Sequence, residues 1–501
     1  MNVNTSTTVR RVTGPPAALA FVCVFHAIAP LIWVGPDLPY EWDETVYISQ
    51  VSLHAPAGLF TAPRARGLTI LLAPLTELTS STAALRWYLA VLSAVGLYLA
   101  FLPWLRLWPG YTVPIAAALF STLWTSIFYG FEAMPNLYVA IGAVASVGYF
   151  LRIRNEPQRP VHLVWLTLWL AFTALMRPYD SLYLVAALLV GAATMRGVSL
   201  RRRGMVSAVL IAAVAVGWSE WIVEAFVSYG GLARRLQAAS AENTAGLHMA
   251  LGLEARALAG PTLCRPCTQP IVWPATAWWF AVPPLVALGV AAAVSRRQAA
   301  LAVLPTCAAL ALLAEYTVTI SYAAPRFLLP VYALASIPAA QGLDWVVGFL
   351  TRWWWRTLWL TAVAAMLAVQ LVSQLAILDR YVVPVQRAIR LQYISVAQAV
   401  REQAWGSPAF WSAIPPLRSP SARAAPMCRR SLMPGSSRRR PAGPMSACSR
   451  PGVWPALFTA DGRAIACELH TCGIGGTSTS TCERERRRGN ARGQPVTTAS
   501  C

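Results

Sequence analysis

Long apolar stretches separated by short polar segments make up most of this chain. A bilayer core needs roughly 20 apolar residues per helix, and eleven stretches reach or approach that length. They cover residues 17–35, 84–104, 112–129, 134–151, 161–177, 179–195, 205–226, 275–294, 299–320, 327–347 and 357–378. The pattern predicts an all-α polytopic membrane helix bundle with about eleven transmembrane helices.

Charges in the connecting segments predict how this bundle is oriented. With the amino terminus in the cytoplasm, the inner segments carry fourteen arginines against two acidic residues, Glu156 and Asp344. The outer segments up to residue 405 carry thirteen arginines and fourteen acidic residues. Because arginine is enriched on the cytoplasmic side of membrane proteins, we expect the amino terminus inside and the segment after residue 378 outside.

Three outer segments are long enough to carry structure of their own. Residues 36–83 contain an acidic cluster and then an apolar run, 68–78, which is too short to span and is expected to lie along the interface or re-enter the membrane. Residues 227–274 form the second outer segment. From about residue 385, apolar residues recur at helical spacing opposite Arg387 and Arg390, which predicts an amphipathic helix on the outer surface.

The chain divides by composition into a transmembrane domain, residues 1–405, and a tail, residues 406–501. The tail is rich in arginine, proline and serine, carries six of the ten cysteines, and has no hydrophobic period. Such a segment is either irregular and disordered or the product of a frameshift in GC-rich coding sequence. We favour the frameshift because every basic residue of the chain is arginine, as a GC-rich gene would encode.

Composition excludes several functional classes. With 56% hydrophobic and 12% charged residues, a chain of 501 residues is too apolar for a soluble protein. The net charge of +21 would suit a nucleic-acid partner, but the arginines lie in short loops and in the tail, so we expect no nucleic acid. The first apolar run leads into proline and acidic residues, so we expect a retained helix and not a cleaved signal peptide.

The acidic cluster after the first apolar stretch is the leading candidate for function. Glu41, Asp43 and Glu44 lie within four residues at the mouth of a membrane helix. Carboxylates so close to hydrocarbon usually face water, a cation or a substrate. The structural alternative is a solvated turn in which Asp43 is the N-cap of a helix starting near Thr45.

The predicted topology brings further polar groups to the same outer face. Each abuts a helix end, which is typical of a common cavity; they are Glu132, Arg177, Asp180, Tyr322 and Arg326. A carboxylate can remove the proton of an acceptor hydroxyl, and the planar guanidinium fork binds a departing phosphate. We therefore expect group transfer from a lipid-linked phosphate, with these five residues binding substrate.

The motifs resemble the GT-C superfamily of polytopic glycosyltransferases, which includes protein-mannosyltransferase and aminoarabinose-transferase types. The resemblance rests on the acidic pair Asp43 and Glu44, on Glu132 in the next outer loop, and on the sequence Pro-Arg-Phe-Leu-Leu-Pro at 325–330. It implies an inverting enzyme of the plasma membrane that transfers sugar from a polyprenyl-phosphate donor to an acceptor hydroxyl on the outer face, among membrane lipid.

The same resemblance implies roles for individual residues. Asp43 is the best match to the family's catalytic acid–base position, and Glu44 lies beside it. Glu132 corresponds to the second acidic site, and Asp43 and Glu132 are the candidate ligands if a divalent cation such as Mg²⁺ or Mn²⁺ takes part. The sequence departs from the family after residue 405, where a soluble outer domain often follows.

Two other functions remain open on the sequence. A secondary transporter should carry ionisable or helix-breaking residues near the midplane in two related halves, and no internal repeat is present here. A non-catalytic membrane scaffold would tolerate replacement of Asp43. Cys264 and Cys267 favour a local disulfide in an oxidising compartment over metal ligation, since two cysteines alone do not make a zinc site.

Overall fold

The computed structural model describes residues 14–195, 197–260, 263–348 and 353–405. Throughout these ranges the regular elements are helices, which confirms the predicted all-α class. The longer ones are α2 (Pro15–Trp33), α5 (Thr82–Phe101), α8 (Pro135–Asn155), α9 (Val161–Met176), α10 (Pro178–Ala193), α11 (Leu200–Ser228), α15 (Val282–Ser295), α16 (Ala300–Val318), α17 (Leu329–Gly348), α18 (Trp353–Ile377) and α19 (Val383–Trp405). The predicted tail, 406–501, lies outside the described residues.

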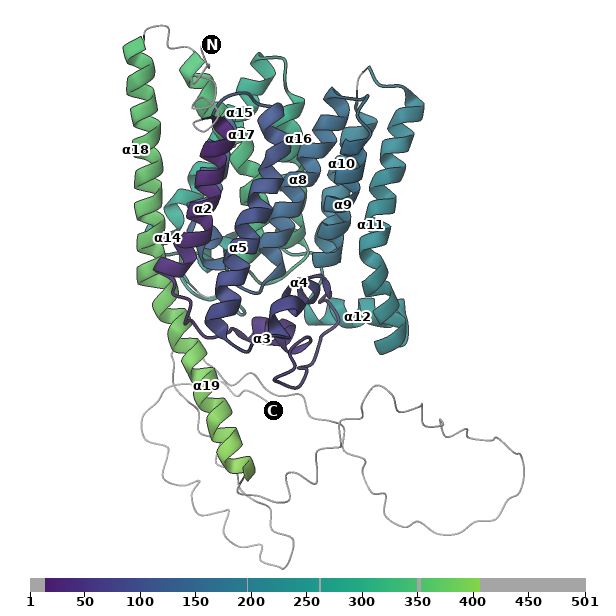
Figure 1. Cartoon of the computed structure of the whole chain (residues 1–501), viewed down its shortest axis with the longest axis vertical. Helices are drawn as coiled ribbons and strands as arrows, with labels where there is room; N and C mark the ends of the chain where they lie inside the picture. Colours follow the sequence, from purple (N-terminus) through teal and green to yellow (C-terminus); the bar gives the residue numbers. More distant parts are fainter. Residues whose placement is uncertain (1–13, 196, 261–262, 349–352, 406–501) are drawn as a thin grey trace, which may run out of the picture. The chain divides into compact units, whose positions relative to one another are not determined.

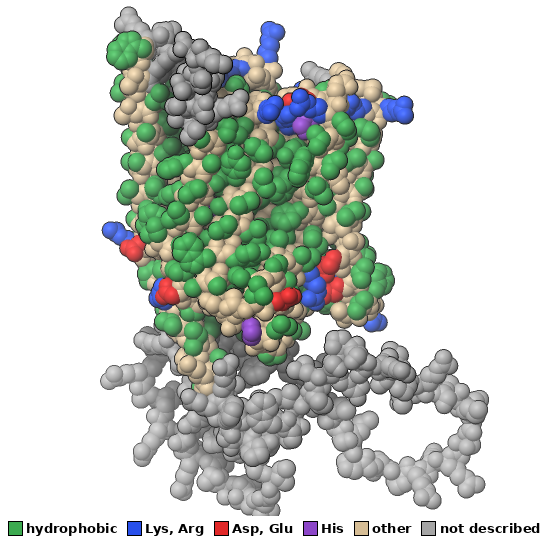
Figure 2. Space-filling view, in the orientation of Figure 1, with side chains coloured by type: hydrophobic (Ala, Val, Ile, Leu, Met, Phe, Trp, Pro, Cys, Tyr) green, Lys and Arg blue, Asp and Glu red, His purple; other side chains and the backbone are tan. Residues whose placement is uncertain are grey.

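The helices form a multi-pass membrane bundle. In the described part of the chain, seven helical segments are long and apolar enough to cross a membrane by length and composition. Four shorter apolar helices accompany them. Each of the eleven predicted stretches contains a helix, and the one in 327–347 is α17. Hydrophobic side chains cover the middle of the visible face in Figure 2, and charged side chains gather towards its two ends.

Helix α8 is the centre of the bundle. Within its membrane-length window 94% of the residues are buried, because α5, α9 and α17 pack around it (Figure 1). Gly142 permits the approach of α9, since a Cβ at that position would clash with the hydroxyl of Thr173. Small residues at such contacts let membrane helices pack closely, and a helix buried on all sides is apolar all round.

The stretch predicted at 112–129 is helical but not one continuous helix, because it forms α6 (Thr112–Ser121) and α7 (Trp124–Tyr129). Two glutamines of α18 bind the backbone at the break. The Nε2 of Gln370 donates to the carbonyl of Leu119 at 3.0 Å, and the Oε1 of Gln374 accepts from the N–H of Trp124 at 2.9 Å. Irregular backbone inside a bilayer requires such partners.

The last described helix differs from the predicted surface helix. Helix α18 continues into α19 through the π-helical turn η4 (Leu378–Val382), as Figure 1 shows. The expectation that Arg390 faces solvent is wrong, since its side chain is fully buried, whereas Tyr393 on the predicted apolar face is 41% exposed. The polar face of α19 therefore turns inwards where Arg390 lies.

The outer segments form short helices at one end of the bundle. The first contains α3 (Trp42–Ser49) and α4 (Gly67–Thr76), and the second contains α12 (Leu232–Glu242), α13 (Leu251–Ala257) and α14 (Trp273–Thr276). Figure 1 places α3, α4 and α12 together. The predicted disulfide between Cys264 and Cys267 is confirmed, and Cys264 pairs through its backbone with Ala323.

Candidate functional site

A cavity of about 450 Å³ lies between the outer segments and the ends of α8, α10 and α16. Five of the seven predicted site residues line it, namely Asp43, Arg177, Asp180, Tyr322 and Arg326. They come from three separate parts of the chain. The lining also balances its charge, with four arginines and four carboxylates: Arg64, Arg177, Arg265, Arg326, Asp43, Asp180, Glu242 and Glu315.

Asp43 lies between two arginines. The Nη2 of Arg64 is 2.6 Å from its Oδ1, and the Nη2 of Arg326 is 2.7 Å from its Oδ2. Burial by itself would raise the pKa of Asp43, but the two guanidinium groups outweigh this effect and hold the pKa below its ordinary value. Asp43 is therefore an ionised carboxylate whose two oxygens are both held by cations.

A capping box presents Asp43 to the cavity. The N-cap of α3 is Glu41, whose side chain accepts from the N–H of Glu44, while the Glu44 carboxylate accepts from the N–H of Glu41 at 2.9 Å. The alternative that Asp43 is itself the N-cap is wrong, because the helix begins at Trp42. Asp43 lies in the first turn of α3 but does not cap the helix. Its side chain binds Arg64 and Arg326 instead.

Arg64 was not among the predicted site residues, and its position depends on Arg235 of α12. The fully buried Arg235 donates to the carbonyls of Ala62 at 3.1 Å and Arg64 at 2.9 Å, and it pairs with Glu224 of α11 at 2.7 Å. These bonds fasten the loop that carries Arg64. In the sequence, Arg64 is one of several arginines in the outer loops, and no local signal distinguishes it.

Arg177 and Asp180 form a second group on the cavity wall. The Nε of Arg177 is 2.9 Å from Oδ1 of Asp180, and the hydroxyl of Tyr316 donates to Oδ2 of Asp180 at 2.6 Å. The guanidinium of Arg177 also lies over the rings of Tyr316 and Phe327, 5.5 Å and 5.7 Å from their centroids. Charge and aromatic contacts thus fix its orientation.

Tyr322 and Arg265 lie on the outer wall of the cavity. The hydroxyl of Tyr322 donates to Oδ1 of Asn243 at 3.2 Å, and the guanidinium of Arg265 lies over the Tyr322 ring, 4.8 Å from its centroid. Arg265 is held in the short loop closed by the disulfide between Cys264 and Cys267. The confirmed disulfide therefore positions a cation at the cavity that the sequence did not suggest.

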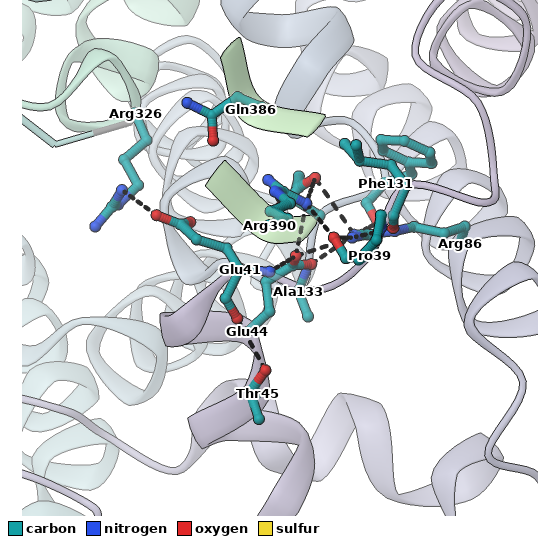
Figure 3. A network of polar contacts seen from close by, with 12 residues as sticks. Pro39, Glu41, Glu44, Thr45, Arg86, Phe131, Ala133, Arg326, Gln386 and Arg390 are labelled. Atoms are coloured by element: carbon teal, nitrogen blue, oxygen red, sulfur yellow. Dashed lines mark hydrogen bonds and ion pairs between the residues drawn. The ribbon is translucent and has the colours of Figure 1, made fainter. Parts of the chain in front are cut away.

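The other two predicted site residues, Glu44 and Glu132, do not line this cavity. Both are fully buried in a cluster with two arginines, Arg86 of α5 and Arg390 of α19. Figure 3 shows Glu44 between these two arginines. Glu44 accepts from the Nη2 of Arg86 at 2.8 Å and from the N–H of Ala133 at 2.8 Å. Both carboxylate oxygens of Glu132 accept from Arg390 at 3.2 Å. We name Glu44, Arg86, Glu132 and Arg390 the buried quartet.

The pKa values of the two carboxyl groups in the buried quartet are shifted in opposite directions. For Glu44, burial favours the neutral form, but Arg86 and Arg390 outweigh it and lower the pKa to about 2. For Glu132, burial is the larger effect, and together with the negative charge of Glu44 it raises the pKa to about 8 against the pull of the arginines. When two carboxyl groups share one site, the negative charge of the first raises the pKa of the second, so their pKa values differ.

The raised pKa of Glu132 predicts that the free energy of unfolding depends on pH. From its ordinary pKa of 4.5 up to about 8, Glu132 holds a proton in the folded state that the unfolded state has released. The free energy of unfolding should therefore fall as the pH rises through this range. We expect the apparent melting temperature in detergent to fall from pH 5 to pH 8 in the native chain, and less in Glu132→Gln. Equal falls in both would contradict the raised pKa.

The predicted divalent-cation ligands do not form a common site. Asp43 binds Arg64 and Arg326 at the cavity, whereas Glu132 binds Arg390 in the buried quartet. In the part of the chain that the structure describes, no group of three or more His, Cys, Asp or Glu side chains could hold a metal ion.

Comparisons with known proteins identify the fold. No family model and no curated protein sequence matches this chain. ArnT from Cupriavidus metallidurans in the apo state is structurally similar, with a TM-score of 0.50 and 14% identity over 74% of this chain and 78% of that chain. This likeness shows that the chain shares the fold of that protein, in agreement with the polytopic helical fold that the sequence predicts.

A second solved structure is similar over a shorter part of its length. It is the archaeal oligosaccharyltransferase AglB from Archaeoglobus fulgidus in complex with an inhibitory peptide and a dolichol-phosphate, at a TM-score of 0.49 and 13% identity. The match covers 73% of this chain, which spans only 56% of that chain.

Proposed function

We propose that this chain is a membrane glycosyltransferase that moves a sugar from a polyprenyl-phosphate donor to an acceptor hydroxyl at the outer face of the plasma membrane. The observation that carries the proposal is the position of Asp43, an ionised carboxylate held by Arg64 and Arg326 on the wall of a 450 Å³ cavity. The GT-C type of fold supports the same reaction class.

The arginines explain how one site can bind phosphate and hold a base. A donor phosphate entering the cavity competes with Asp43 for the guanidinium groups of Arg64 and Arg326, because the planar guanidinium fork suits phosphate oxygens. Transfer of these bonds to the phosphate releases a carboxylate oxygen of Asp43. Its pKa then rises towards the ordinary value, which makes it a better base for the acceptor proton.

The transfer step balances with these groups alone. The acceptor oxygen forms a bond to the anomeric carbon from the face opposite the phosphate, and its proton passes to Asp43. The bond between the anomeric carbon and the phosphate oxygen breaks, and the polyprenyl phosphate leaves with the electron pair. Arg64, Arg326 and Arg177 stabilise the charge that develops on the leaving phosphate. Attack from the opposite face inverts the anomeric configuration.

Transfer of labelled sugar tests this proposal. Membranes from a host that lacks the gene are expected to gain transfer from polyprenyl-phosphate sugars to endogenous acceptors when this chain is expressed. The anomeric configuration of the released product, determined by NMR, is expected to be opposite to that of the donor. Folded protein that transfers none of a panel of neutral, amino and acidic sugars would contradict the proposal, and retained configuration would contradict inversion.

A further inference from the structure

Asn136 lines the cavity with an amide that binds nothing in the protein. It lies in the first turn of α8, its side chain is 1% exposed, and neither its Nδ2 nor its Oδ1 has a hydrogen-bond partner among the described residues. An unpaired buried polar group destabilises a protein, so buried amides are almost always hydrogen-bonded. A fully unpaired amide on a cavity wall indicates a ligand.

A second free acceptor lies on the same cavity. Glu315 of α16 is 4% exposed, and its Oε2 has no partner within the described ranges. Its neighbour Asp180 differs, because both oxygens of Asp180 are bound, one by Arg177 and one by Tyr316. Asn136 and Glu315 thus bring two donors and at least two acceptors to one cavity, from two helices far apart in the chain.

We propose that Asn136 and Glu315 bind the sugar ring of the donor and determine which sugars are accepted; this inference rests on the proposed function. Ring hydroxyls both donate and accept hydrogen bonds, which matches an amide beside a carboxylate. The amide and the carboxyl group come from two different helices, so a sugar is bound tightly only where its ring hydroxyls or amino group reach both. The site therefore distinguishes sugars by the positions of these groups on the ring.

Binding to purified protein separates this inference from the proposed function. The probes are undecaprenyl phosphate without sugar, and undecaprenyl phosphate carrying a neutral hexose, a pentose, an amino sugar or a uronic acid. The native chain is expected to bind its preferred sugar lipid more tightly than the bare lipid phosphate.

The variant Asn136→Leu is expected to lose roughly tenfold or more in affinity for the sugar lipid, because hydrogen bonds to the ring are lost. Its affinity for undecaprenyl phosphate should not change. Its melting temperature should stay the same or rise, since no hydrogen bond of the protein is removed. Ser146→Ala is the matched control, because Ser146 is a buried, unpaired side chain of the same helix that does not line the cavity.

The variant Glu315→Leu is expected to lose several-fold in affinity for the sugar lipid, because a hydrogen-bonding partner of the ring is lost, while its affinity for undecaprenyl phosphate should not change. Equal affinity of the native chain for sugar-bearing and bare lipid would overturn the sugar site while leaving the proposed lipid donor intact. No affinity for any lipid phosphate would overturn the proposed function as well. Equal loss of sugar affinity in Asn136→Leu and Ser146→Ala would also overturn the inference.

Discussion

Replacing Asp43 with asparagine is expected to abolish sugar transfer, lowering the rate by about 10³-fold or more, since a general base contributes roughly 10²- to 10⁴-fold. Asparagine has the same shape but accepts no proton from the acceptor hydroxyl. It also removes the negative charge that binds Arg64 and Arg326, so a donor phosphate meets one competitor fewer for these two guanidinium groups. Donor affinity should therefore stay the same or increase while the turnover number falls.

Asp37→Asn is the matched control for this experiment. Asp37 belongs to the same outer segment, but it pairs with Arg387 at 2.9 Å, is 67% exposed, and does not line the cavity. Initial rates of label transfer, normalised to the amount of folded protein, should fall in Asp43→Asn alone. Equal rates in the native chain and Asp43→Asn would remove Asp43 from the mechanism.

Replacing Arg390 with leucine is expected to destabilise the protein by about 3–5 kcal/mol, the usual cost of breaking a buried ion pair. Arg390 binds both oxygens of Glu132, one oxygen of Glu44 at 3.3 Å, and the carbonyl of Pro39 at 2.6 Å. Its loss removes the hydrogen bonds to both oxygens of Glu132 and the buried contact between α19 and the loop before α3.

Arg387→Leu provides the control, because Arg387 lies one turn earlier on α19 and forms an exposed pair with Asp37. Exposed pairs contribute about 0–1 kcal/mol. The apparent melting temperature in detergent should therefore fall strongly for Arg390→Leu and little for Arg387→Leu. Similar values for the two variants would show that the buried quartet does not hold α19 against the outer segment.

The sequence was sufficient for those features that depend on local pattern. Hydrophobic length located the helices, because each segment must satisfy its own backbone in a bilayer. Hydrophobic length did not predict the break at Thr122 and Leu123. The backbone there is hydrogen-bonded by Gln370 and Gln374 of α18, about 250 residues away in the chain. The disulfide between Cys264 and Cys267 was also a local inference, and it is present.

The candidate site was predicted in part. Placing helix ends on one face correctly grouped Asp43, Arg177, Asp180, Tyr322 and Arg326 around one cavity. The same reasoning treated Glu44 and Glu132 as partners of Asp43. A helix turns neighbouring side chains in different directions, so adjacent Asp43 and Glu44 bind different arginines, and the distinction depends on which residues surround α3.

Sequence by itself therefore determined the class of the protein, its membrane helices and the face on which its polar residues gather. Each of these follows from the hydrophobicity or the charge of one segment at a time. Tertiary structure alone decided which charges meet. Arg326 reaches Asp43 across 283 residues of chain, and Arg390 reaches Glu132 across 258. Such contacts have no local signature, since their strength comes from burial and geometry that exist only once the helices have packed.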